Sequence, residues 1–319
     1  MIVPDRSPRL VLALIGAVLV GVLTATQSRI NSELATQLGD GYLAAIISFG
    51  SGLVILLGVL AVWAPGRQGA RTLISAVRTG ATPWWYLCGG VAGGIFVLAQ
   101  GLTAGLLGVA LFTIAVVSGQ TASGLVVDRL GLGTMAPASI TVTRLAGSLL
   151  ALAAVGWAVS SQLRADIPVW AVLLPLLAGI GLGWQQAANG QVRVVAGSAM
   201  TATLMNFVAG TTVLTIAAII RVAIVGWPET LPAQPWLYLG GLTGTLFIGL
   251  AIVSVKHTGV LLLGLGGVAG QLLTSLALDV FAPVAGHSVA WTTVAGTALT
   301  LVAVGIAAIP SRPITRGRR

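Results

Sequence analysis

The side chains best suited to chemistry in this sequence are amides that lie within apolar segments. Gln27 and Asn31 are four residues apart, as are Gln185 and Asn189. Residues at this spacing lie on one face of a helix. Each pair therefore offers hydrogen-bond donors and acceptors to a polar solute without a fixed charge. Alternatively, the amides bond neighbouring helices to each other, because unpaired polar groups are costly in lipid.

Two further amides each precede an acidic residue by the same interval. Gln120 precedes Asp128, and Gln271 precedes Asp279. The interval spans about 12 Å along a helix. If each Asp lies at a helix end near the membrane surface, each Gln lies near the midplane, where membrane transporters bind solutes. A purely structural role for both Gln residues is the alternative.

Asp128 and Asp279 are the acidic residues best placed to carry protons, because they occupy matching positions in the two halves of the chain. The alternative is that they anchor helix ends at the membrane interface, for Asp128 beside Arg129 or Arg144. The only cysteine is Cys88 and the acids are scattered singly, so neither a metal site nor a cofactor is expected. A phosphate-binding GxxxxGK[ST] loop is absent from the sequence, which argues against drive by ATP.

The composition is that of a membrane protein. Apolar residues make up 56% of the 319 residues and charged residues 7%, whereas a soluble domain carries about 25% charged residues. So few charges cannot cover a water-facing surface, so we predict an all-α integral membrane protein. The arginines fall between apolar segments and at the termini rather than in one patch, so nucleic-acid binding is not expected.

Apolar runs of roughly 20 residues, long enough to cross about 30 Å of hydrocarbon, recur along the whole chain. They predict about ten transmembrane helices, at residues 10–30, 42–63, 84–104, 106–127, 138–160, 169–190, 199–222, 236–255, 258–279 and 289–309. The longest connection, around 64–83, is too short for a soluble domain. With the N-terminus inside, most Arg and Lys residues of the connections lie on the cytoplasmic side. We therefore expect a multi-pass protein of a bacterial inner membrane with both termini cytoplasmic.

The chain also repeats itself, which is important to recognise before a fold is assigned. Residues 21–52 align with residues 179–210 without a gap, and later motifs follow in the same order. The two copies predict five-helix units at 1–162 and 163–319, which together form one transmembrane domain. Because five is odd, the second unit enters from the opposite side, as in the inverted repeats of secondary transporters. Matched positions include Gln27 with Gln185, Asn31 with Asn189, Ser48 with Asn206, Phe49 with Phe207 and Gly52 with Gly210.

These motifs resemble the YdcZ-type branch of the drug/metabolite transporter superfamily. The resemblance rests on Q-x-x-x-N at the end of the first helix, A-x-x-x-S-F-x-x-G after it, and G-Q-x7-D in the fourth helix. It covers nearly the whole chain and implies a ten-helix, exporter-like fold. One departure is Asn206, where the first copy has Ser48; another is the Arg-rich connection that the second half lacks. The residues that carry the resemblance are Gln27, Asn31, Ser48, Phe49, Gly52, Gly119, Gln120 and Asp128, then Gln185, Asn189, Phe207, Gly210, Gly270, Gln271 and Asp279.

We therefore predict a secondary transporter, an exporter of small metabolites or drug-like compounds that works by alternating access. Two alternatives are a membrane enzyme acting on a lipid-linked substrate and a non-transporting membrane scaffold. The expected partners are a small-molecule substrate and membrane lipid. The sequence leaves open the substrate, the direction of transport, the coupling ion, and whether the protein is a monomer or a homodimer. The predicted substrate pathway consists of Gln27, Asn31, Gln120, Gln185, Asn189, Asn206 and Gln271.

Overall fold

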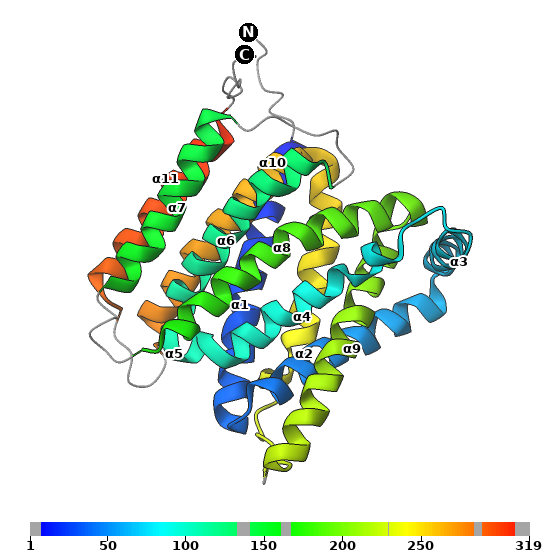
Figure 1. Ribbon diagram of the computed structural model, residues 1–319, viewed down its shortest axis with the longest axis horizontal. Coiled ribbons are helices and arrows are strands. Elements are labelled where there is room, and N and C mark those ends of the chain that lie inside the picture. Colours follow the sequence, from blue (N-terminus) through cyan, green and yellow to red (C-terminus); the bar gives the residue numbers. More distant parts are fainter. Residues whose placement is uncertain (1–7, 133–140, 161–166, 229, 284–288, 310–319) are drawn as a thin grey trace, which may run out of the picture.

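The computed structural model describes residues 8–132, 141–160, 167–228, 230–283 and 289–309, and the elements in them are helices (Figure 1). A 3-10 turn precedes α4 at Trp84–Cys88 and another precedes α10 at Pro235–Tyr238, while a π-helical turn at Gln100–Ala104 joins α4 to α5. The predicted all-α fold is confirmed. The α-helices are α1 (Pro8–Leu38), α2 (Gly41–Val62), α3 (Ala64–Arg78), α4 (Gly89–Ala99), α5 (Gly105–Leu107), α6 (Val109–Leu130), α7 (Val142–Ser160), α8 (Val169–Ala196), α9 (Ala199–Val225), α10 (Gly240–Phe281) and α11 (Trp291–Ala308).

The apolar helices agree with the predicted membrane spans. Within the described residues, 8 helical segments are long and apolar enough to cross a membrane, and the shorter apolar helices Val142–Ala158 and Gly240–Ala251 fall at the fifth and eighth predicted spans. Large apolar side chains such as Leu12 and Val54 are exposed on the outside of the bundle. Lipid can solvate these side chains, and the backbone polar groups are satisfied within the helices. The multi-pass membrane fold is therefore confirmed.

The eighth and ninth predicted spans belong to one long helical segment, α10, which was expected to be two helices. Gly244 lies against Gln27 of α1 and Ser254 lies against Gly16, so the first part of α10 runs toward the N-terminus of α1. The last part, residues 263–281, then returns along α1 in the opposite sense (Figure 1). The chain thus makes two passes, and the prediction is wrong only in placing a connection between them.

The predicted connection at 64–83 contains an amphipathic helix, α3. Its buried face carries Gly66, Gly69 and Leu73. Gly66 lies against Met200 and Gly69 against Thr201, at the start of α9. Three arginines of α3 are on its exposed side: Arg67, Arg71 and Arg78. The apolar residues of α3 recur with a helical period. The helix is too short and too polar to cross a membrane, so it is a connection between spans and not a further span.

The two halves of the chain pack through reciprocal contacts. Gly21 of α1 lies against the carbonyl of Gly267 in α10, and Gly179 of α8 lies against the carbonyl of Val116 in α6. In both places a Cβ atom would collide with the facing backbone, so glycine allows the close approach that membrane helices use. The first helix of each half thus packs on the fourth helix of the other half, as expected for two copies related by a two-fold axis.

The same exchange is seen between the last helices of the halves, α7 and α11, which lie side by side (Figure 1). Gly147 of α7 lies against the carbonyl of Ala303, and Gly296 of α11 lies against the carbonyl of Ala154. Helices α2 and α9 are related in the same manner, because the rings of Phe49 and Phe207 stack with centroids 4.8 Å apart. The division into units at residues 162 and 163 stays a prediction.

Candidate functional site

One cluster of buried amides joins α1 to the π-helical turn. Asn31 donates from Nδ2 to Oε1 of Gln100 over 2.6 Å, and Gln100 donates from Nε2 to Oγ of Ser28 over 2.8 Å. All three residues have no exposed surface. We call Gln27, Ser28, Asn31 and Gln100 the first cluster. It closes the space between α1 and the turn that carries Gln100.

Gln27 bonds the first cluster to the second half of the chain. Its Nε2 donates to the carbonyl of Gly240 over 2.8 Å, at the first residue of α10. Gly240 lies against Asn31 Oδ1, and Gly244 lies against Gln27 Nε2. Only glycine leaves room for these amides, since a Cβ atom at either position would collide with them. The predicted pair of Gln27 and Asn31 is therefore brought together on one side of α1.

Gln100 is a member of this cluster that sequence reasoning missed. It occupies the first position of the π-helical turn. Such turns are rare overall, but those that occur often lie at functional sites. Its place within an apolar run is the feature that could identify it, because a buried polar residue is costly unless it has a hydrogen-bond partner. The sequence repeat does not indicate Gln100, because the matching residue in the second half is Ala251.

A second cluster is formed by the matching residues of the other half. Asn206 of α9 accepts at Oδ1 from Gln185 Nε2 over 2.7 Å and from Asn189 Nδ2 over 3.3 Å. Gly89 and Gly93 of α4 lie against these amides, as Gly240 and Gly244 lie against the first cluster. We call Gln185, Asn189 and Asn206 the second cluster. The three predicted residues do meet in the structure.

The two clusters differ in burial. Every member of the first cluster is buried, whereas Gln185 and Asn189 of the second are partly exposed. Each cluster also contains a buried carbonyl oxygen without a hydrogen-bond partner among the described residues, Asn31 Oδ1 in the first and Gln185 Oε1 in the second. A buried acceptor without a donor costs free energy, so these oxygens can bind an incoming donor favourably.

The two remaining glutamines lie in α6 and α10, and neither has a described hydrogen bond to a member of the two clusters. Gln271 is buried in α10 beside Gly21, while Gln120 is partly exposed on α6. The glycines that precede them pack closely, Gly270 on the carbonyl of Val18 and Gly119 on that of Leu176. The predicted solute contacts of both glutamines stay predictions.

Asp279 caps a helix of the other half. Its Oδ1 accepts from the backbone N–H of Val109 over 3.0 Å, and its Oδ2 accepts from that of Ala110 over 2.7 Å. These amides begin α6, where no intrahelical acceptor is available to them. Asp128 lies in the last turns of α6, and its side chain is outside the described part of the chain. Proton carriage by either residue stays a prediction.

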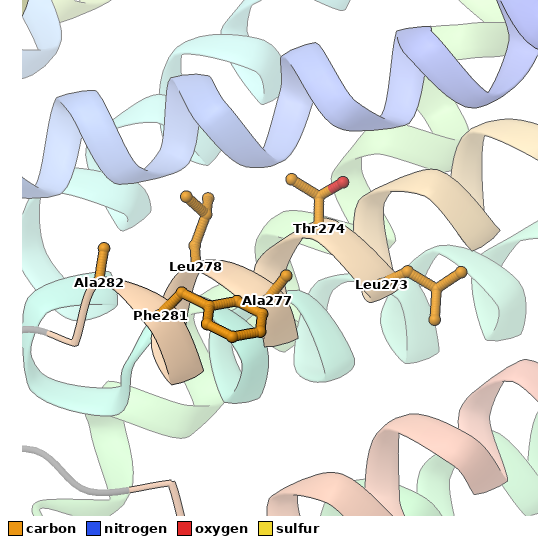
Figure 2. A pocket seen from close by; sticks show the side chains of 6 residues that line it. All are labelled: Leu273, Thr274, Ala277, Leu278, Phe281 and Ala282. Carbon is orange, nitrogen blue, oxygen red and sulfur yellow. The ribbon is translucent and has the colours of Figure 1, made fainter.

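An open cavity of about 430 Å³ lies along the C-terminal end of α10, and no member of either cluster lines it (Figure 2). Its lining is apolar except for the hydroxyl of Thr274, and Phe281 at its end is largely exposed. An open apolar surface on a membrane helix suits lipid chains better than a polar solute. This cavity is therefore not our candidate for the site of solute binding. Its lining residues are Leu273, Thr274, Ala277, Leu278, Phe281 and Ala282.

Comparison with known proteins agrees with this architecture. No curated protein matches the chain. Residues 12–157 and 170–306 each match one protein family, which is described as "Putative inner membrane exporter, YdcZ". These two matched segments cover most of the chain and correspond to the two copies of the sequence repeat. Together with the apolar helices, the match shows that this chain is a multi-pass inner-membrane protein of the DMT_YdcZ family.

Proposed function

We propose that this protein is a secondary transporter that exports small metabolites or drug-like compounds by alternating access. The observation that carries this proposal is the pair of amide clusters at matching positions of the two halves, one closed and one partly open. A transporter with two-fold related halves needs a gate on each side of the solute, and the gates must open in turn. The closed first cluster and the partly open second cluster correspond to one such state.

The positions of the clusters support an inward-facing state. With both termini in the cytoplasm, α1 runs outward, and the first cluster near its end lies on the outer side. Helix α8 runs inward, so the second cluster lies on the cytoplasmic side. This orientation would make the described conformation inward-facing, with the first cluster closed by the bonds of Gln100 and with Gln185 and Asn189 of the second cluster partly exposed.

The amides also indicate the chemistry of the solute. Gln185 Oε1 and Asn31 Oδ1 are buried acceptors without partners among the described residues, so a solute that carries N–H or O–H donors would satisfy them. Neither cluster contains a charged side chain, so a fixed charge on the solute is not required. We expect small polar compounds with several donors to bind better than apolar ones.

A ligand screen followed by flux measurement tests the proposal. Purified protein is screened by thermal shift against metabolites and toxic compounds, and each hit is then measured for flux in liposomes. Gln185→Leu should abolish the stabilisation by the solute and lower the flux at least about ten-fold, the loss of one or two buried hydrogen bonds. Gln186→Leu is the matched control, because Gln186 is adjacent but exposed. Equal flux in both variants would contradict a role for the second cluster.

Proton coupling through Asp128 and Asp279 is a separate part of the proposal. The two residues occupy matching positions of the repeat, and carboxylates inside membrane spans serve as proton relays in many transporters. Purified protein in liposomes with an imposed pH gradient provides the test. If Asp128→Asn and Asp279→Asn leave gradient-driven flux unchanged, neither residue carries the coupled proton.

A further inference from the structure

The arginines of α3 lie on one side of that helix. Four exposed residues of α3 recur at intervals of four, three and four positions, the spacing of a single helix face. They are Arg67, Arg71, Ile74 and Arg78, which we call the basic stripe. The buried residues of α3, among them Leu73, lie on another side of the helix and pack against α8 and α9. The basic stripe is therefore turned away from the protein.

The charge of the basic stripe is not neutralised by nearby acids. The sequence contains no Asp or Glu between Asp40 and Asp128, and none in residues 167–228, which include α8 and α9. Arg67 Nη1 donates to the carbonyl of Ala61 over 2.6 Å, at the end of α2. The other two arginines of the stripe have no side-chain hydrogen bond or ion pair with any residue that the structure describes.

The surroundings of α3 are those of a helix at the membrane surface. Figure 1 views α3 nearly along its axis, whereas α2 and α4, the spans on either side of it, run across the picture. Helix α3 thus lies crosswise to these spans. Trp63 directly precedes α3, Trp84 and Trp85 begin the turn before α4, and all three are exposed. Exposed tryptophans at the ends of spans are typical of the boundary between lipid tails and headgroups.

The basic stripe has no counterpart in the second half of the chain. The corresponding connection, residues 226–234, contains no Arg or Lys and has one acidic residue, Glu229. The charge is therefore confined to one side of the protein, which is the cytoplasmic side in the orientation proposed above. Anionic lipids give the cytoplasmic leaflet a negative surface potential that attracts basic segments next to membrane spans. A guanidinium group also matches a phosphate group in shape, with two parallel hydrogen bonds.

We propose that the basic stripe is a binding site for anionic phospholipids of the cytoplasmic leaflet. Arg71 and Arg78, which have no partner among the described residues, bind the phosphate groups, and Ile74 between them contacts the acyl chains. This division of a helix into a basic and an apolar contact is how amphipathic helices bind a membrane surface. The proposal goes beyond the proposed transport function, because it assigns a lipid site to a helix outside both clusters.

The buried side of α3 connects this site to the second cluster. Thr201 Oγ1 of α9 donates to the carbonyl of Gly66 over 3.3 Å, and Leu73 packs with Val192 of α8. Val192 is three residues beyond Asn189, within one helical turn of the second cluster. A lipid that holds α3 at the membrane surface therefore also stabilises the contacts of α3 with α8 and α9, and with them the folded protein.

Thermal unfolding in detergent with added lipid tests the proposal. The purified full-length protein is mixed with phosphatidylglycerol or, at the same concentration, with phosphatidylcholine. Phosphatidylglycerol should raise Tm by about 3 °C or more above the value in phosphatidylcholine, because a lipid that binds the folded protein stabilises it. The difference should shrink in about 0.5 M NaCl, since salt screens exposed charges. Inorganic phosphate at the same concentration should give no such rise, because it has no acyl chains.

Variants locate the binding to the stripe. Arg71→Gln combined with Arg78→Gln should remove at least about half of the rise in Tm, whereas Lys at both positions keeps the charge and should retain most of it. Arg71→Gln alone is compared with Arg129→Gln, since each removes one exposed arginine and Arg129 lies on α6, outside the stripe. Only Arg71→Gln should reduce the rise. All variants should unfold at the wild-type temperature in phosphatidylcholine, because the changed side chains are exposed.

Native mass spectrometry gives a second, direct measurement. The wild type should retain more phosphatidylglycerol than the double variant with Gln at positions 71 and 78. Equal retention in the two proteins would overturn the proposal, and so would an equal rise in Tm in the two proteins. A rise of the same size with phosphatidylcholine or inorganic phosphate, or an equal loss in Arg129→Gln, would overturn it too. No transported solute enters these measurements, so their outcome is independent of the proposed function, which Gln185→Leu tests.

Discussion

Arg221 donates from Nε to Oδ2 of Asp40 over 2.8 Å, and this ion pair joins the end of α9 to the start of α2. The same carboxylate accepts at Oδ1 from the backbone N–H groups of Tyr42 and Leu43, so Asp40 is also the N-cap of α2. One side chain thus performs two tasks, a local one within the first half and a connecting one between the halves.

We expect Asp40→Ala to destabilise the protein more than Arg221→Gln does. Loss of the cap costs about 1–2 kcal/mol, and loss of the partly exposed ion pair costs about 1 kcal/mol or less. Thermal unfolding of the purified protein in detergent measures both. Because Asp40→Ala already removes the ion pair as well as the cap, the double variant should be no less stable than Asp40→Ala. Equal losses of stability in the two single variants would contradict this expectation.

The stacked rings of Phe49 and Phe207 predict a strict size limit at two glycines. Gly52 of α2 lies against Phe207, and Gly210 of α9 lies against Phe49. Gly52→Ala should lower stability by about 1–3 kcal/mol, because the added methyl group overpacks the crossing of the helices. Gly58→Ala in the same helix has open space around it and should be neutral or slightly stabilising. Thermal unfolding distinguishes the two, and equal behaviour would contradict a tight crossing.

Gln100→Leu should loosen the closed side of the protein. The substitution leaves Asn31 Nδ2 without the partner described above, at a cost of about 1–3 kcal/mol. In a Cys88→Ser, Ser28→Cys background, maleimide labelling of the single cysteine in the first cluster should therefore become faster. Gln37→Leu on the exposed end of α1 is the control and should not change the rate. Slower labelling in Gln100→Leu would mean that Gln100 does not hold the cluster closed.

The buried face of α3 predicts unequal effects at two adjacent residues. Leu73 is 1% exposed and packs with Val192, Ala196 and Ala202, whereas Ile74 is 51% exposed. Leu73→Ala should lower stability by about 2–4 kcal/mol through the cavity that it leaves, and Ile74→Ala should change it little. Thermal unfolding provides the comparison. Similar losses in both variants would indicate that the two faces of α3 have been assigned incorrectly.

Much of the fold could be predicted from the sequence because lipid imposes a simple requirement, a long apolar run for every span. The four-residue spacing of Gly90 and Gly94 in α4, and of Gly266 and Gly270 in α10, likewise predicts close packing. The contacts of Gly90 with the backbone of Asn206 and of Gly270 with the carbonyl of Val18 agree. Arg29 and Glu33 are four residues apart on α1, a spacing that predicts an ion pair, and Arg29 Nη2 lies 3.9 Å from Glu33 Oε2.

Other features could not be predicted, because they depend on tertiary contacts or on backbone geometry. Gln100 is recognised as a site residue only once α4 brings it beside α1, since its matching residue is Ala251. The cap formed by Asp279 joins residues 170 positions apart, and the spacing within each half contains no sign of it. The reversal of α10 without a loop is equally invisible, because an apolar run has the same composition whether it is straight or bent.

Gln100 and its counterpart Ala251 also have a consequence for the empty protein. The outer side closes with two bonds of Gln100 that have no counterpart in the second half, whereas the second cluster has two bonds to Asn206, whose counterpart is Ser48. If the protein alternates as proposed, its two conformations are held by different bonds and need not be equally populated without solute. With the proposed orientation, a resting population that faces the cytoplasm would bind a cytoplasmic solute without losing affinity to a rare conformation, whereas an external solute would lose it. The side chains that break the repeat would in this way set the side from which the transporter is loaded.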